Sequence, residues 1–111
     1  MSKRKDAFTA LADPTRRAIL ELLREEPGLA AGAIAARFPD VSRPAISKHL
    51  GVLRRARLVR AREVGREWHY TVDARPLAEI YMEWLEGFAP LMEQSLERLK
   101  YRVEGIRQRE D

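Results

Sequence analysis

Residues 41–59, VSRPAISKHLGVLRRARLV, carry side chains that could contact a polyanion along one side of a helix. With about 3.6 residues per turn, Ile46, Leu50 and Leu53 fall together and would form a buried seam. The opposite side holds only small or basic residues: Pro44, Ser47, Lys48, Gly51 and Arg55. Small side chains let a helix backbone lie deep in the major groove of DNA, where Ser and Lys reach base edges or phosphates. The pattern predicts a helix that docks in this groove.

The glycine at position 51 needs an explanation, because glycine costs a helix about 1 kcal/mol relative to alanine. A close approach of the helix backbone to DNA would supply one. The alternative is an ordinary solvated amphipathic helix with an incidental glycine, since charged outer faces are common. The helix alone leaves both explanations open.

Two runs rich in β-forming residues, 58–63 and 66–72, follow this helix and are joined at Val64-Gly65. Gly65 has the backbone freedom that a hairpin tip requires. The two runs therefore predict a β-hairpin directly after the helix.

Arginines on this hairpin extend the basic surface. Arg62 and Arg66 could lie along phosphates or enter the neighbouring minor groove. The alternative is an edge strand protected by charge, which suits Arg60 best because it lies nearer the strand centre. The hairpin makes a nucleic-acid contact the favoured interpretation of the helix before it.

Positive charge is concentrated in the middle of the chain. The 111 residues carry a formal net charge of +4, but residues 41–72 alone hold eight basic and two acidic residues, a net of +6. Residues 1–40 hold seven basic and six acidic residues, a net of +1, and residues 73–111 hold six and nine, a net of −3. A local excess of this kind is the electrostatic footprint of a nucleic-acid-binding protein.

Five helices are expected, over residues 4–12, 14–26, 30–38, 43–56 and 75–105. Asp13-Pro14 marks a helix start, because the Asp side chain accepts from free backbone N–H groups and Pro has none to lose. Ser42 is placed to cap the fourth helix. The order predicts a mainly α domain with a small β-hairpin wing, a winged helix-turn-helix, spanning residues 1–111.

The last helical segment, 75–105, would span about 45 Å, too long for so small a chain to cover. Its apolar stripe therefore calls for a partner, and a second copy is the simplest one. The alternative is that the stripe belongs to the core of one chain. Gly87 and Pro90 predict a kink or break between 86 and 90, because Pro90 has no N–H to donate and disfavours α geometry at Ala89.

Several kinds of chemistry are not expected. The absence of cysteine excludes disulfides, thiolate metal sites and thiol redox sensing. His49 and His69 are the only histidines, too few for a zinc site, and His49 suits packing or a phosphate contact better. Ser47 and His49 are two residues apart on a helix and cannot form a nucleophile–base pair. With no phosphate-binding or dinucleotide motif either, we expect neither an enzyme nor a cofactor.

The chain has no apolar run of about 20 residues, the length of a membrane span, and its start, MSKRKD, is no signal peptide. We therefore expect no membrane contact and a cytoplasmic protein.

Three runs, LADPTRRAILELL (11–23), VSRPAISKHLGVLRRARLV (41–59) and VGREWHYTV (64–72), resemble ArsR-type winged-helix transcriptional repressors, most closely their metal-independent branch. The resemblance covers residues from about 7 to 100. It implies a homodimer, formed by the first and last helices, that binds double-stranded DNA. It also implies that the fourth helix is the recognition helix and that Val64–Glu67 belongs to the wing.

The predicted DNA-binding residues are Ser42, Arg43, Pro44, Ser47, Lys48, His49, Gly51, Arg55, Arg62, Gly65 and Arg66. The predicted dimer interface comprises Phe8, Leu11, Leu77, Ile80, Tyr81, Trp84, Leu85, Phe88, Leu91 and Met92.

The sequence departs from the family pattern in two ways. Arg57 stands where the family usually has a glycine after the recognition helix, and a non-glycine residue is disfavoured in a left-handed cap, so a different turn is expected. The third helix has no Cys and residues 75–111 have no His, which speaks against a metal sensor of the family's usual kinds.

The sequence thus predicts a dimeric, sequence-specific DNA-binding repressor with an inverted-repeat operator. One alternative is a protein-interaction module built on the same fold, although such a module needs no basic recognition face. Another is a repressor whose dimer interface holds an apolar effector, lined by Trp68, Tyr70, Tyr81, Trp84 and Phe88.

Overall fold

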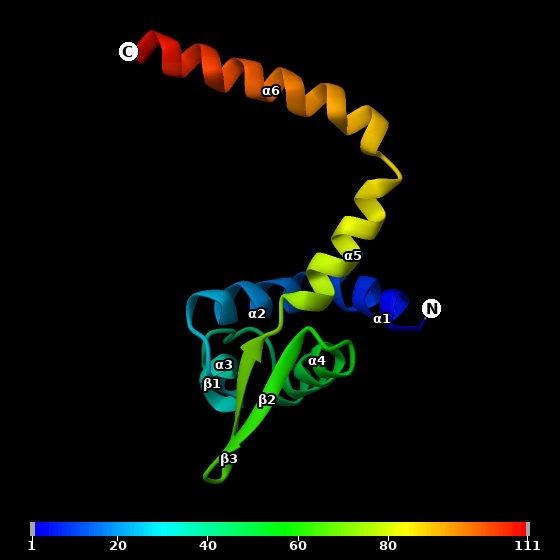
Figure 1. Ribbon diagram of the computed structural model, residues 1–111. Helices are drawn as coiled ribbons and strands as arrows, with labels where there is room; N and C mark the ends of the chain where they lie inside the picture. Colours follow the sequence, from blue (N-terminus) through cyan, green and yellow to red (C-terminus); the bar gives the residue numbers. More distant parts are fainter. Residues whose placement is uncertain (1, 111) are drawn as a thin grey trace. The chain divides into compact units, whose positions relative to one another are not determined.

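The computed structural model describes residues 2–110, with side chains described over 6–105. Its contacts divide the chain into two compact units, Met1–Ala78 and Glu79–Asp111. The elements in chain order are α1 (Ser2–Leu11), α2 (Pro14–Glu25), β1 (Leu29–Ala30), α3 (Ala31–Ala36), α4 (Arg43–Arg55), β2 (Val59–Val64), β3 (Glu67–Val72), α5 (Arg75–Glu86) and α6 (Ala89–Glu110) (Figure 1). The predicted fold class, mainly α with a small β-hairpin wing, is confirmed, and a third short strand extends the hairpin into a sheet. That residues 1–111 form one domain stays a prediction.

Side-chain caps fix the starts of α2 and α4, as the sequence predicts. The Oδ2 atom of Asp13 accepts a hydrogen bond from the backbone N–H of Arg16 at 3.0 Å, with Pro14 in the first position of α2. The Oγ atom of Ser42 accepts from the backbone N–H of Ala45 at 3.2 Å. Each cap satisfies an N–H group that a helix start leaves free, and each contributes about 1 kcal/mol to helix stability.

The core of the first unit lies where α2, α3, α4 and the start of β2 meet. Its fully buried large side chains are Ile19, Leu23, Ile34, Ile46, Leu50, Leu53 and Leu58. The predicted inward seam of α4 is therefore confirmed, since all three of its members are in this set. Burial of a side chain of this size contributes roughly 1.5–3 kcal/mol, enough to fix the rotation of α4 about its axis.

A short strand that the sequence analysis did not predict joins the hairpin. The sheet has the order β1-β3-β2, and Leu29 of β1 lies opposite Tyr70 of β3. Gly28, at a φ of +86°, donates its N–H to the carbonyl of Tyr70 at 2.9 Å. Ala30 thus belongs to a strand, and α3 is shorter than the predicted helix 30–38. A strand of two residues has no periodicity that a sequence could show.

The predicted hairpin is present, shifted by one residue. β2 pairs antiparallel with β3 from Val59 opposite Val72 to Val64 opposite Glu67, which leaves Gly65-Arg66 as a two-residue turn. Gly65 has a φ of +63°, as the first residue of a tight hairpin turn requires. Arg66 therefore lies at the tip itself.

The turn after α4 corrects one expectation. Arg57 does adopt the left-handed conformation, with a φ of +63°. Its N–H donates to the carbonyl of Arg54 at 3.0 Å, and the N–H of Leu58 donates to the carbonyl of Leu53 at 2.9 Å. These two bonds form the Schellman motif, with buried Leu58 as its hydrophobic residue. The burial of Leu58 holds the turn in place despite the arginine.

In the second unit the predicted long helix is interrupted. α5 ends at Glu86 and α6 begins at Ala89, within the range 86–90 for which Gly87 and Pro90 predict a kink or break. Ala89 nonetheless belongs to α6, and Pro90 lies in the first turn of this helix, where a missing N–H costs no hydrogen bond. Within residues 2–110 no helix is both long and apolar enough to cross a membrane.

Candidate nucleic-acid interface

The outward side of α4 is open to solvent. Its predicted contact residues Ser42, Arg43, Pro44, Ser47, Lys48 and Arg55 are exposed, and Gly51 is half-buried. Because the buried seam fixes the rotation of the helix, this exposed side is a defined surface of small and basic residues. Its contact with DNA stays a prediction.

Gly51 makes room for an arginine of the same helix. A Cβ atom added to Gly51 would lie 3.3 Å from Nη1 of Arg55, so the Arg55 guanidinium lies over the glycine in the structure. Residues four apart in a helix are neighbours on its surface, which explains the contact. Gly51 thus has a structural use that the sequence analysis did not foresee, besides the predicted close approach to DNA.

A second glycine, Gly32, leaves room for an arginine at the start of α4. A Cβ atom added to Gly32 of α3 would lie 3.1 Å from Nη2 of Arg43. Contacts this close are tighter than a relaxed side chain usually makes, so a larger residue at position 32 would displace the Arg43 guanidinium. Gly32 therefore leaves the space that the Arg43 guanidinium occupies.

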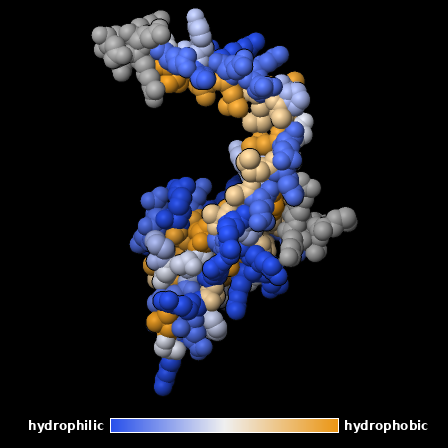
Figure 2. Space-filling view, in the orientation of Figure 1, coloured by the Kyte–Doolittle hydropathy of each residue, from blue (hydrophilic) through white to orange (hydrophobic). Residues whose placement is uncertain are grey.

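The wing carries its exposed arginines along one strand and at the tip. Arg62 of β2 lies opposite His69, and Arg66 lies in the exposed turn, where Figure 2 shows hydrophilic side chains at the end of the hairpin. Arg60, by contrast, pairs with Asp73, its Nε atom 3.0 Å from Oδ2. This difference agrees with the structural role that the sequence suggests for Arg60.

One contact between α4 and the β2–β3 hairpin was not predicted from the sequence. The guanidinium of Arg54 in α4 lies over the ring of Trp68 in β3, 5.1 Å from the ring centroid. At a half-exposed site such a cation–π contact contributes about 0.5–1 kcal/mol. Trp68, which the sequence analysis names as a candidate for an effector pocket, packs against Arg54 of α4, and the pocket stays a prediction.

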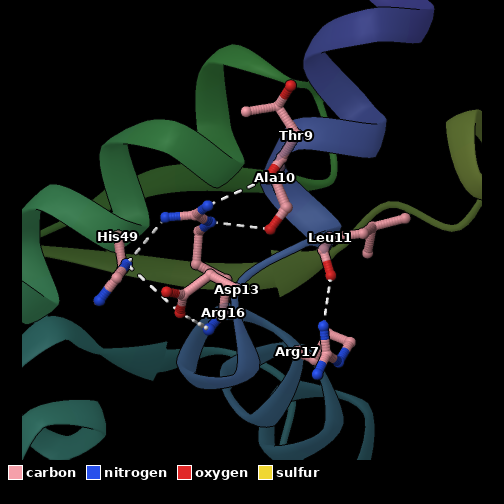
Figure 3. Close-up of polar contacts among 7 residues, drawn as sticks. All are labelled: Thr9, Ala10, Leu11, Asp13, Arg16, Arg17 and His49. Atoms are coloured by element: carbon pink, nitrogen blue, oxygen red, sulfur yellow. Dashed lines mark hydrogen bonds and ion pairs between the residues drawn. The ribbon is translucent and has the colours of Figure 1, made fainter.

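His49 is turned away from the exposed side of α4 and toward α2 (Figure 3). Its Nδ1 atom lies 3.2 Å from Nη1 of Arg16 and 4.0 Å from Oδ2 of Asp13, and only 19% of its side chain is exposed. The structure thus brings His49 together with two residues of the helix start at 13–16 rather than with Ser47 and Lys48. The predicted DNA contact of His49 stays a prediction, whereas its predicted place at the edge of the core agrees with the burial.

Two aspartates of the first unit, Asp13 and Asp73, have lowered pKa values. Hydrogen bonding from the backbone N–H of Arg16 is the main cause that lowers the pKa of Asp13. Hydrogen bonds from the side chain and backbone of Arg75, followed by the Arg60 side chain, lower the pKa of Asp73 to about 2. Both carboxylates are held in their charged form by groups that donate to them.

Half of the predicted interface residues between Leu77 and Met92 are exposed although they are apolar. Tyr81, Trp84, Phe88 and Leu91 are more than two-fifths exposed, as is Phe8 of α1, whereas Leu11, Leu77, Ile80, Leu85 and Met92 are half-buried. The α5–α6 junction also forms an apolar groove of about 390 Å³, lined by Met82, Leu85, Glu86, Ala89, Met92, Glu93 and Leu96. Figure 2 shows hydrophobic residues along one side of α6.

Comparisons with known proteins identify the family. Residues 11–62 match a family model described as a helix-turn-helix domain. The chain is 46% identical to the HTH-type transcriptional regulator Rv2034 of Mycobacterium tuberculosis, over 78% of this chain and 86% of that protein. It is 35% identical to the transcriptional repressor SdpR of Bacillus subtilis, over 75% of this chain and 89% of that protein.

Solved structures of similar fold are also transcriptional regulators. An ArsR-like transcriptional regulator from Rhodococcus sp. RHA1 is similar with a TM-score of 0.68 and 35% identity, over 89% of this chain and 91% of that one. The ArsR family transcriptional regulator RHA00566 is similar with a TM-score of 0.71 and 29% identity, over 83% and 92%. The chain therefore belongs to the ArsR-type winged helix-turn-helix family of DNA-binding transcriptional regulators.

Proposed function

We propose that this protein is a sequence-specific repressor that binds an inverted-repeat operator as a two-fold dimer and blocks access to the promoter. The observation that carries the proposal is the exposed side of α4, where Ser47, Lys48 and Arg55 face solvent while the opposite side is locked in the core. The name of the relative SdpR, a transcriptional repressor, supports repression rather than activation.

Each group in this surface has a chemical role in the proposal. Ser47 and Lys48 lie near the middle of the exposed side and would reach base edges or phosphates in the major groove. Arg62 and Arg66 of the wing would contact phosphates or the minor groove beside it. Within the described residues Lys48, Arg62 and Arg66 have no acidic partner, so binding DNA breaks no ion pair.

A second copy would cover the apolar surface of the C-terminal helices. Leu91 is 72% exposed and Tyr81 62%, values that are costly for apolar side chains in water. The family resemblance supports the same partner, with α1 contributing Phe8 and Leu11. A two-fold axis would present two recognition helices to successive major grooves, about 34 Å apart on the operator.

We propose further that the protein acts in the cytoplasm by binding alone, without a metal or catalysis. Its relatives are named transcriptional regulators rather than enzymes. The sequence has no cysteine, and residues 75–111 have no histidine, which supports the metal-independent branch.

The proposal is tested by selecting fragments from a genomic library and measuring their affinity by fluorescence anisotropy. Light scattering after size-exclusion chromatography gives the mass in parallel. We expect enrichment of an inverted repeat and a mass of twice the 12.8 kDa chain. Binding of selected and random fragments with equal affinity would contradict the proposal and favour a protein-interaction module. A monomer at saturating operator would contradict the dimer.

A further inference from the structure

Two neighbouring arginines of α2 hold the C-terminal end of α1 (Figure 3). Arg17 donates from Nη1 to the carbonyl of Leu11 at 2.8 Å. Arg16 donates from Nε to the carbonyl of Ala10 at 2.7 Å and from Nη2 to the carbonyl of Thr9 at 3.1 Å. A helix leaves its last carbonyls without partners, so both arginines satisfy groups at the end of α1.

Only Arg16 also reaches the recognition helix. Its Nη1 atom lies 3.2 Å from Nδ1 of His49 in α4. A guanidinium has donors only, so Nδ1 accepts this hydrogen bond in the tautomer that carries the ring proton on Nε2. One rigid planar group thus joins the end of α1 to the middle of α4.

The residues around the Arg16 guanidinium favour a well-defined geometry of its contact with His49. Ala7 and Ala10 of α1 are fully buried, so α1 packs closely against its neighbours beside the guanidinium. The backbone N–H of Arg16 is itself fixed by the carboxylate of Asp13, which also lies 4.0 Å from the His49 ring. Because these hydrogen bonds are partly shielded from solvent, water competes for them less than it does for a fully exposed pair.

We propose that Arg16 is a positioning residue for DNA recognition: through His49 it sets the position of α4 relative to the end of α1. His49 directly follows Lys48 in α4, so a shift at His49 moves the exposed side of the helix. The inference rests on the proposed function, in which α4 contacts DNA and α1 contributes to the dimer. In that dimer the two Arg16 links would hold the recognition helices at the spacing of the half-sites.

The chain offers a matched pair of variants, Arg16→Lys and Arg17→Lys. Lysine keeps the charge but cannot donate in several fixed directions, so each variant weakens the hold on α1. Arg17 does not contact α4 in any described interaction, and serves as the control. We expect both variants to melt at slightly lower temperatures, but only Arg16→Lys to bind the operator about tenfold more weakly.

Variants of His49 distinguish the loss of the Arg16–His49 hydrogen bond from a general loss of stability. His49→Ala removes the acceptor, and we expect the same tenfold loss of operator affinity, with no further loss when it is combined with Arg16→Lys. His49→Asn places an amide oxygen near the position of Nδ1, so it should restore most of the affinity. All affinities are measured well below the melting temperature of the least stable variant, on operators with the natural and with altered half-site spacing.

Weaker binding by Arg16→Lys together with a flatter spacing preference supports the inference. Equal losses for Arg16→Lys and Arg17→Lys, or additive losses in the double variant, overturn it. So does a His49→Asn variant that binds as poorly as His49→Ala. If the wild-type protein selects no operator, the proposed function fails instead, which the wild-type titration alone reveals.

Discussion

The two units of the chain differ in how far their apolar side chains are exposed to solvent. In the first unit Ile19, Leu53 and Leu58 are fully buried, and the exposed side of α4 is small and basic. In the second unit Leu91 and Leu96, on a helix of 22 residues, are more than half exposed. Isolated helices gain most of their stability from packing of an apolar face. The difference indicates that the first unit has its own core, and it supports the proposal that a second copy covers the apolar side chains of the second unit.

Residues 41–72 and residues 73–111 also differ in net charge. Residues 41–72, which include α4 and the β2–β3 hairpin, carry a net charge of +6, whereas residues 73–111 carry a net charge of −3. A polyanion attracts the first region and not the second. This difference in charge supports the two proposed partners, DNA for residues 41–72 and a second copy of the chain for residues 73–111.

The largest expected effect tests whether the first unit has its own core. Leu53→Ala leaves a cavity beneath α4 and should lower the free energy of unfolding by about 2–5 kcal/mol. Leu99→Ala, on the exposed stripe of α6, should change the stability of the monomer by no more than about 0.5 kcal/mol. Urea denaturation at low protein concentration measures both. Equal effects would remove the contrast between the units.

The next effect tests the partner of the second unit. Leu96→Glu introduces a charge into the apolar groove, and should raise the dissociation constant of the dimer about 100-fold or more. Tyr101→Glu is the control, because helical spacing places position 101 on the side opposite Leu96 and Leu99. Analytical ultracentrifugation measures the dissociation constant, and equal dissociation of both variants would exclude the stripe as the interface.

A smaller effect is expected at the end of α4. Arg57→Gly removes the steric cost of the left-handed conformation and should raise the free energy of unfolding by about 1 kcal/mol. Arg55→Gly, at the last residue of α4, should lower the free energy of unfolding by up to about 1 kcal/mol. Thermal melts of the two variants should therefore move in opposite directions. A destabilised Arg57→Gly variant would show that the arginine side chain holds the turn.

The smallest effect is a pH dependence at Asp73. Its folded-state pKa of about 2 lies below the ordinary value of 3.8, so the ionised carboxylate stabilises the fold above about pH 4 and loses this effect as the pH falls toward 2. Asp73→Asn should lower the melting temperature at pH 7, with a difference that shrinks between about pH 4 and 2. Asp40→Asn, at an exposed turn, is the control. A difference that persists at pH 2 would assign the effect to shape rather than charge.

Local patterns were enough to predict most of the first unit. The caps at Asp13 and Ser42, the buried seam of α4 and the glycine at the hairpin tip each depend on residues close in sequence. Such signals follow from backbone hydrogen bonding and helical periodicity, which neighbouring residues determine.

Long-range contacts were beyond the sequence patterns. The pairing of Leu29 with Tyr70, the stacking of Arg54 on Trp68 and the bond from Arg16 to His49 join residues far apart in the chain. Arg57 shows the converse, because its local preference against a positive φ is outweighed by the burial of Leu58. Position on a helical wheel placed His49 beside the core but could not name its partner.

The most direct test of the recognition surface is the salt dependence of operator binding by Lys48→Ala and Arg66→Ala. Each variant should weaken binding and reduce the slope of log affinity against log salt by about one per phosphate contact removed, while the dimer persists. Lys100→Ala, which removes the same charge from α6, should leave the slope unchanged. Wild-type affinity and slope in both Lys48→Ala and Arg66→Ala would contradict the assignment of α4 and the wing as the DNA-binding surface.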